Sequence, residues 1–193
     1  MSKSKKVLRT ILVAGVLSAL AALATFSAFS SQTDNPGNTV TAGTVALTDN
    51  DGGTAAYNVT NAKPGQGSTA FCIRVAYSGS LDADLKMYTP SAIGSLGQYV
   101  NLKVEPGSQA VPNTNCAGFV ADASGAVFDA ALNTFPTSYA TGVSDYPGAA
   151  ATKWVNTDAV VYRVTATLSA GAPDVAQGLT TGSHTIRFEA RNQ

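Results

Sequence analysis

Residues 68–77, STAFCIRVAY, decide the fold class of this chain. Large apolar side chains recur at every second position from Phe71 to Tyr77, and the positions between them hold Cys72, Arg74 and a small residue. Successive side chains of a β-strand point to opposite faces of its sheet, so this two-residue period predicts a half-buried strand. Cys72 is expected on the outer face of that strand, opposite the apolar side chains.

The same period recurs in both directions along the chain. The first two further strands, residues 39–48 and 54–60, flank a turn of sequence DNDGG and are expected to form a hairpin. Pro106 is expected to end a strand at residues 100–105, and a short helical turn is expected near residues 130–134. The other expected strands are residues 81–88, 126–129, 159–168 and 184–191.

Short strands separated by Gly- and Pro-containing turns, with no amphipathic helix among them, are typical of two-sheet folds. The abundance of Ala, Thr, Gly, Val and Ser and the scarcity of Lys and Glu favour strands over helices. The sequence therefore predicts an all-β, two-sheet antiparallel sandwich of the jelly-roll type at residues 39–193, preceded by an N-terminal signal-peptide helix.

The first 27 residues are predicted to be a signal peptide. A basic head is followed by an apolar run at residues 11–24 and then by small residues, which is the order typical of secretory signal peptides. The apolar run is short for a membrane span, but residues 10–33 carry no charge, so an uncleaved membrane anchor stays the alternative. The residues of the basic head are Lys3, Lys5, Lys6 and Arg9.

Cleavage is predicted between Ser27 and Ala28, because Thr25 and Ser27 are small and flank the bulky Phe26. A flexible leader at residues 28–38 would then precede the sandwich domain. Cleavage removes four of the twelve basic residues and no acidic one, which leaves eight basic against twelve acidic residues and a net charge of −4. A mildly acidic domain has no electrostatic reason to bind nucleic acid, so no nucleic-acid partner is expected.

Cys72 and Cys116 are the two cysteines of the chain, and both follow the predicted cleavage site. An exported chain meets an oxidising environment, which favours a disulfide between them, and two separately packed thiols are the alternative. A disulfide would hold the irregular loop at residues 106–118 over the outer face of the strand that carries Cys72.

Two candidate chemical sites have simpler structural interpretations. The run Asp49-Asn50-Asp51-Gly52 resembles the start of a calcium loop, but Thr60 stands where such a loop needs a bidentate glutamate, so a turn is expected. His184 is the single histidine, and no HExxH or GxSxG motif accompanies it. It is therefore expected to be a polar residue at the edge of a strand.

Two further clusters could form sites on the surface. Asp82, Asp84 and Lys86 share one strand face, and the lysine beside the two carboxylates favours a solvated face over acid–base chemistry. Trp154 with Tyr139 and Tyr146 is a candidate aromatic platform for a sugar. Packing of the lone tryptophan over an open end of the sandwich is the alternative.

Several short stretches resemble the TasA/camelysin family of exported bacterial surface and biofilm-matrix proteins. The resemblance covers both ends and the first third of the domain, and it is slight over residues 106–153. The stretches that carry it are TFSAF at 25–29, TAGTVAL at 41–47, YNVTNAKPG at 57–65, Phe71 with SGSL at 78–81, and IRFEA at 186–190.

This resemblance implies a secreted structural protein of the cell surface or biofilm matrix. It implies cleavage between Ser27 and Ala28 by a SipW-type signal peptidase, a jelly-roll fold, and self-assembly into fibres by donation of an N-terminal strand. A freed strand can add to an open sheet edge through main-chain hydrogen bonds, and head-to-tail addition that does not close gives a filament. The donor would consist of Ala28, Phe29, Ser30, Ser31, Gln32 and Thr33.

Two other functions stay open at this stage. The camelysin name implies a secreted metalloendopeptidase, but the single histidine and the lack of a zinc motif favour a protein with no enzymatic activity and no cofactor. A surface glycan-binding β-sandwich module is the third hypothesis. All three place the protein outside the cell, with membrane contact only through the signal segment before cleavage.

Overall fold

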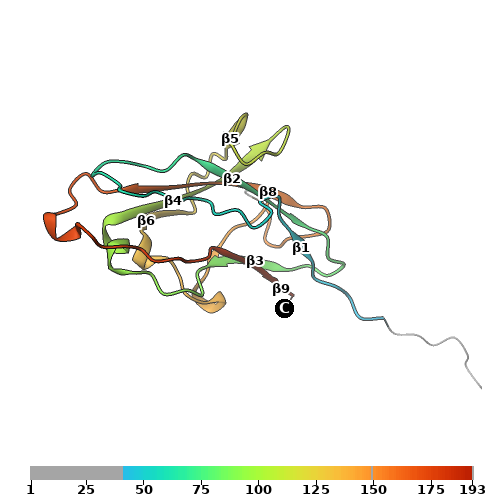
Figure 1. Cartoon of the computed structure of the whole chain (residues 1–193). Helices are drawn as coiled ribbons and strands as arrows, with labels where there is room; N and C mark the ends of the chain where they lie inside the picture. Colours follow the sequence, from blue (N-terminus) through green and yellow to red (C-terminus); the bar gives the residue numbers. More distant parts are fainter. Residues whose placement is uncertain (1–40, 149, 193) are drawn as a thin grey trace, which may run out of the picture. The chain divides into compact units, whose positions relative to one another are not determined.

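Two antiparallel sheets form the sandwich that the sequence predicts (Figure 1). The structure is a computed structural model that describes residues 41–148 and 150–192, and both sheets lie in the unit that begins at Ala42. The larger sheet contains β1 (Leu47–Thr48), β2 (Phe71–Tyr77), β8 (Ala159–Leu168), β4 (Val100–Gln109), β5 (Phe119–Ala121) and β6 (Phe128–Ala131). The smaller sheet contains β7 (Val143–Ser144), β3 (Asp84–Tyr88) and β9 (Arg187–Arg191).

The signal peptide at residues 1–27, the cleavage site between Ser27 and Ala28, and the leader at 28–38 with its donor segment lie outside the described residues. Within the described part, no helix has the length and hydrophobicity to cross a membrane. The helical segments there are short 3₁₀ turns, and the one at Leu132–Thr134 confirms the turn expected near residues 130–134. These turns are η1 (Ser95–Tyr99), η2 (Leu132–Thr134), η3 (Tyr139–Thr141) and η4 (Asp174–Ala176).

The core lies between the sheets and is built from the strands with the clearest two-residue period. β2 pairs with β8, and β8 pairs with β4, in registers that align their apolar positions, as in the pairs Ile73 with Tyr162 and Leu102 with Ala166. Opposite them, Leu85 and Met87 of β3 are fully buried. Each such side chain contributes about 1.5–3 kcal/mol when buried, so alternation along three central strands suffices to fix which face is inside.

β4 runs through Pro106 to Gln109, so the prediction that Pro106 ends this strand is wrong. A proline has no N–H for the ladder and is tolerated in a strand only where no donor is needed. Here the Pro106 carbonyl accepts a hydrogen bond from the Asp122 N–H (2.9 Å), so this edge of the residue faces the gap between β5 and β6. No ladder hydrogen bond is therefore lost at the proline.

The expected hairpin of residues 39–48 with 54–60 is also wrong. In the described part of the first stretch, β1 pairs with Ala76 and Tyr77 of β2. Residues 54–60 form no strand. Tyr57 and Val59 are half-buried on either side of the exposed Asn58, and Ala56 and Tyr57 pack against the core. The period-two pattern therefore reflects an irregular segment that lies on the core.

Candidate functional site

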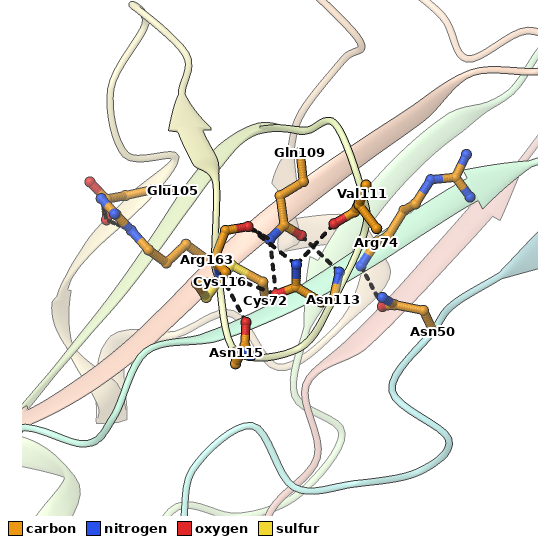
Figure 2. The surroundings of a disulfide bond; sticks show 11 residues. Asn50, Cys72, Arg74, Glu105, Gln109, Val111, Asn113, Asn115, Cys116 and Arg163 are labelled. Carbon is orange, nitrogen blue, oxygen red and sulfur yellow. Dashed lines mark hydrogen bonds and ion pairs between the residues drawn. A yellow bond between two sulfur atoms is a disulfide. The ribbon is translucent and has the colours of Figure 1, made fainter.

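A disulfide joins Cys72 of β2 to Cys116, with the two Cα atoms 5.1 Å apart (Figure 2). This confirms the favoured pairing, and Cys72 is fully buried although it lies on the outer face of its strand. The burial arises because the loop at residues 110–118 lies over that face, as the sequence predicts for a bridged chain. The disulfide therefore fixes this loop at the edge of the larger sheet.

The loop is also held by its own amide side chains (Figure 2). The Asn113 side chain donates to the carbonyl oxygens of Val111 (2.9 Å) and Ala117 (3.2 Å), and the Gln109 side chain donates to the Ala117 carbonyl (3.0 Å). Asn115 accepts from the Ala117 N–H (3.0 Å). Side chains thus take the place of a backbone ladder in this segment, which explains why it has no strand pattern in the sequence.

The outer edge of β2 is covered along its length. The Cys72 N–H donates to the Thr114 carbonyl of the disulfide-held loop (3.0 Å). The Arg74 N–H donates to the Asn50 side chain (2.7 Å; Figure 2). Ala76, the next residue along this edge of β2, pairs with Thr48 of β1. A strand edge whose donors are all taken cannot accept another strand, so this edge is protected.

This arrangement also settles the role of the sequence Asp49-Asn50-Asp51-Gly52. It forms a turn, as expected, in which the Asp51 carboxylate accepts from the Gly53 N–H (2.7 Å). Gly52 and Gly53 both have positive φ, which glycine adopts without strain. The turn places Asn50 against β2, so the tip of this turn completes the cover of the β2 edge.

The edge strand β9 of the smaller sheet is different. It pairs with β3 from Tyr88–Arg187 to Asp84–Arg191, and within the described residues its other edge has no backbone hydrogen-bond partner (Figure 1). Phe188 packs on the Tyr162 ring, with the ring centroids 5.1 Å apart, so β9 is anchored in the core. The strand therefore presents five residues of ordered backbone with one free edge.

The prediction of a solvated Asp82, Asp84 and Lys86 face is wrong for Asp84, which is 9% exposed. The Lys153 ammonium donates to its carboxylate (2.6 Å), and so does the Tyr146 hydroxyl (3.2 Å). This face of β3 is covered because η3 and the segment after it fold back across the strand, and the Tyr139 hydroxyl donates to the Asp84 carbonyl (2.9 Å). Sequence reasoning missed this cover because its residues come from an irregular segment.

The aromatic platform for a sugar, predicted from Trp154, Tyr139 and Tyr146, is not formed, because the same segment packs these residues into the fold. Trp154 is fully buried, and its backbone bridges Ala83 next to β3. Tyr139 is buried and Tyr146 is half-buried, so the three rings do not present a common face to solvent. The tryptophan is therefore a core residue, in accord with the packing alternative.

His184 lies before β9 and binds the Tyr57 hydroxyl through Nε2, while Nδ1 lies 3.0 Å from the Gly182 carbonyl oxygen. Burial raises the pKa of Tyr57, so its hydroxyl remains a donor at neutral pH. The pair lines a cavity of about 280 Å³ together with Asp51 and Ile186. In this geometry the histidine holds residues 54–60 on the core.

The described residues contain no group of three or more His, Cys, Asp or Glu side chains that could hold a metal ion. No protein-family model and no curated protein matches this chain. The features that can bear on function are thus the capped edge of β2, the free edge of β9 and the polar clusters described above.

Proposed function

We propose that this protein is a secreted structural subunit that assembles into fibres, with the N-terminal segment of one subunit adding as a strand to β9 of the next. The observation that carries the proposal is the contrast between the edge of β2 and the edge of β9. The long edge at β2 is covered by a disulfide-held loop, a turn and β1, whereas the outer edge of β9 has no backbone partner among residues 41–148 and 150–192. Soluble proteins usually block exposed edges, so an ordered free edge is a feature that needs an explanation.

The lengths of donor and acceptor agree. β9 has five residues, and the donor Ala28–Thr33 has six before the charged and turn-forming residues DNPG begin. The proline and glycine of that run would end a donated strand and act as a hinge toward the next domain. Strand addition supplies affinity through main-chain hydrogen bonds, which does not require a strongly apolar donor.

The proposed location is the extracellular matrix or the cell surface, reached through the signal peptide and a SipW-type signal peptidase. The disulfide supports this location because disulfides form and persist in oxidising environments. The resemblance to the TasA/camelysin family leads to the same proposal from the N-terminal sequence. A homopolymer is accordingly the proposed assembly.

The experiment compares the mature chain, residues 28–193, with a chain that begins at residue 39, by light scattering over hours. The mature chain should assemble and the shorter chain should stay monomeric. A synthetic peptide of residues 28–38, added in excess, should occupy β9 and stop growth, while a peptide of the same composition in scrambled order should not. Equal assembly of the two chains would refute strand donation.

A further inference from the structure

The inward-facing side chains of β9 are less buried than those of its neighbour β3. Ile186, directly before the strand, and Phe188 and Ala190 within it pack on the core but are only half-buried. On the same face of the smaller sheet, Leu85 and Met87 of β3 are fully buried. β3 has a strand on both sides, whereas within the described residues β9 has one only on the β3 side. The layer of core side chains is therefore incomplete beside β9.

The free edge of β9 lies on the β2 side of the sandwich. At one side of the smaller sheet, Ser144 of β7 lines a cavity with Ser108 of β4. At the other side, Ile186 at the start of β9 lines a pocket with Ile73 of β2. The smaller sheet thus runs from β7 through β3 to β9 as the larger sheet runs from β4 through β8 to β2. A strand added to β9 would begin or end at this pocket.

The pocket is large enough for an aromatic ring. Its volume is about 280 Å³, and its wall combines Ile73 and Ile186 with residues 53–57. An apolar cavity of about 150 Å³ accommodates benzene, so a phenylalanine side chain fits here. Tyr57, which is bound to His184, closes one side of the pocket.

The pocket also contains a carboxylate without a counter-charge. Asp51 lines it, no lysine or arginine is among its lining residues, and Asp51 forms no ion pair with any other described residue. Burial raises the pKa of Asp51 although the Gly53 N–H donates to its carboxylate, and the nearby Asp49 raises this pKa further. A cationic group beside Asp51 would favour the ionised carboxylate. The pocket therefore suits a ligand that joins an apolar ring to a positive charge.

The N-terminus that signal cleavage would create has both groups. Cleavage between Ser27 and Ala28 leaves a free ammonium on Ala28, and Phe29 follows it directly. Phe29 is the one large apolar residue among residues 28–38. Capture of a chain terminus by its charge is a recurrent mode of peptide recognition.

We propose that this pocket binds the new N-terminus of the donated segment, with the Phe29 ring against Ile73 and Ile186 and the Ala28 ammonium beside the Asp51 carboxylate. The inference rests on the proposed strand donation and adds which end of the donor is recognised. A chain that keeps its signal peptide has no ammonium at this position, so the pocket selects processed subunits.

This anchor fixes the direction of the donated strand. With Phe29 beside Ile186, a parallel strand places residues 30–34 along the whole of β9, whereas an antiparallel strand carries them away from it. Because both strands alternate with a period of two, Phe29 then faces the core and Asp34 lies on the outer face beside Arg191. The Arg191 side chain is exposed, so it is accessible to the Asp34 carboxylate.

The first test measures by light scattering how peptides stop assembly of the mature chain, residues 28–193. The probe is the synthetic peptide of residues 28–38 with a free N-terminus, and its matched forms are N-acetylated or carry Phe29→Ala or Phe29→Leu. Acetylation and Phe29→Ala should each raise the concentration that halves growth about tenfold, because each removes one anchor. Phe29→Leu keeps an apolar side chain and should raise that concentration about threefold.

Asp51→Asn in the mature chain tests the partner of the ammonium. The free and acetylated peptides should act equally on this variant, because the two changes remove the same interaction. Asp174→Asn, at an exposed aspartate outside the pocket, should keep the difference between the two peptides.

The outcomes separate this inference from strand donation itself. If acetylation or Phe29→Ala leaves the potency of the peptide unchanged on the wild type, the inference is overturned and strand donation stands. If the unmodified peptide does not stop growth, or if chains that begin at residues 28 and 39 assemble equally, strand donation is refuted and the inference falls with it.

Cysteine cross-linking tests the direction. A peptide of residues 28–38 with Ser30→Cys is oxidised with mature chains that carry Arg187→Cys or Arg191→Cys, and mass spectrometry detects the joined product. The parallel arrangement places Ser30 beside Arg187, so the Arg187→Cys chain should be joined and the Arg191→Cys chain should not. Any other pattern would overturn the proposed direction.

Discussion

At the scale of single residues, the environment of Asp145 predicts how stability depends on pH. Burial raises the pKa of this carboxyl above 3.8, so the folded state binds its proton more tightly than the unfolded state does. Its contribution to stability is fully present below pH 3.8 and is lost as the pH rises through the raised value. Asp145→Asn should therefore be more stable than the wild type at pH 7.

Urea unfolding followed between pH 3 and pH 7 checks this prediction. The difference in free energy of unfolding between Asp145→Asn and the wild type should grow toward neutral pH. A constant difference over this range would show that the carboxyl does not titrate differently in the folded state.

Glu105 should show the opposite dependence. Burial alone would raise its pKa, but hydrogen bonds from Lys103 and Arg163 outweigh this effect and lower the pKa below 4.5. Its contribution is present above pH 4.5 and is lost as the pH falls through the lowered value. Glu105→Gln should cost about 1 kcal/mol at pH 7, because both cations are partly exposed, and less at pH 3.

The same series of urea experiments measures this effect. Asp129→Asn is a suitable control, because Asp129 is an exposed carboxylate on the neighbouring strand whose partner is a neutral amide, Asn101. An equal loss for Glu105→Gln at both pH values would contradict the account.

At the scale of elements, the disulfide is predicted to be a major source of stability for the loop over β2. It closes 44 residues of chain, for which the chain-entropy model gives about 4 kcal/mol. The double variant Cys72→Ala/Cys116→Ala should lose a comparable amount in urea unfolding, and amide exchange should accelerate in residues 110–118. Wild type in reducing agent is the control, and unchanged exchange in that loop would contradict the role given to the bridge.

Strands buried on one face could be predicted from sequence, and the covers of their edges could not. The period from Phe71 to Tyr77 and that of residues 159–168 identified β2 and β8, because burial alone sets those patterns. The Asn50 contact with β2 depends on a side chain 24 residues away from its donor, which no local pattern reports. The strand was predicted to end at Pro106, but it continues. The proline is accepted there because its missing N–H would face the gap between β5 and β6, which the sequence does not report.

Some of the candidate sites could likewise be predicted from sequence, and others could not. The Cys72–Cys116 pair could be predicted because the two cysteines have no competitors. The burial of Asp84 and the meeting of Asp145 with Tyr162 could not, because irregular segments bring these residues together. Trp154 is buried in the core, and its backbone is tied to Ala83 by an isolated bridge outside any strand, which no local sequence pattern reports.

At the scale of the whole molecule, the central claim is that the edge of β2 is closed to further strands and the edge of β9 accepts one. In this account the covered β2 edge keeps the subunit from adding a strand there, and β9 receives the donor. A single donor and a single acceptor in each subunit give head-to-tail growth, which extends as a filament when it does not close on itself.

Hydrogen exchange of backbone amides, measured on the mature protein before and after incubation under assembly conditions, tests this claim most directly. The account predicts filaments in which amides of Arg187–Arg191 and of residues 28–33 become protected, while those of Cys72 and Arg74 keep the protection that they already have in the monomer. Filaments with new protection at β2 and none at β9, or no assembly at all, would contradict it.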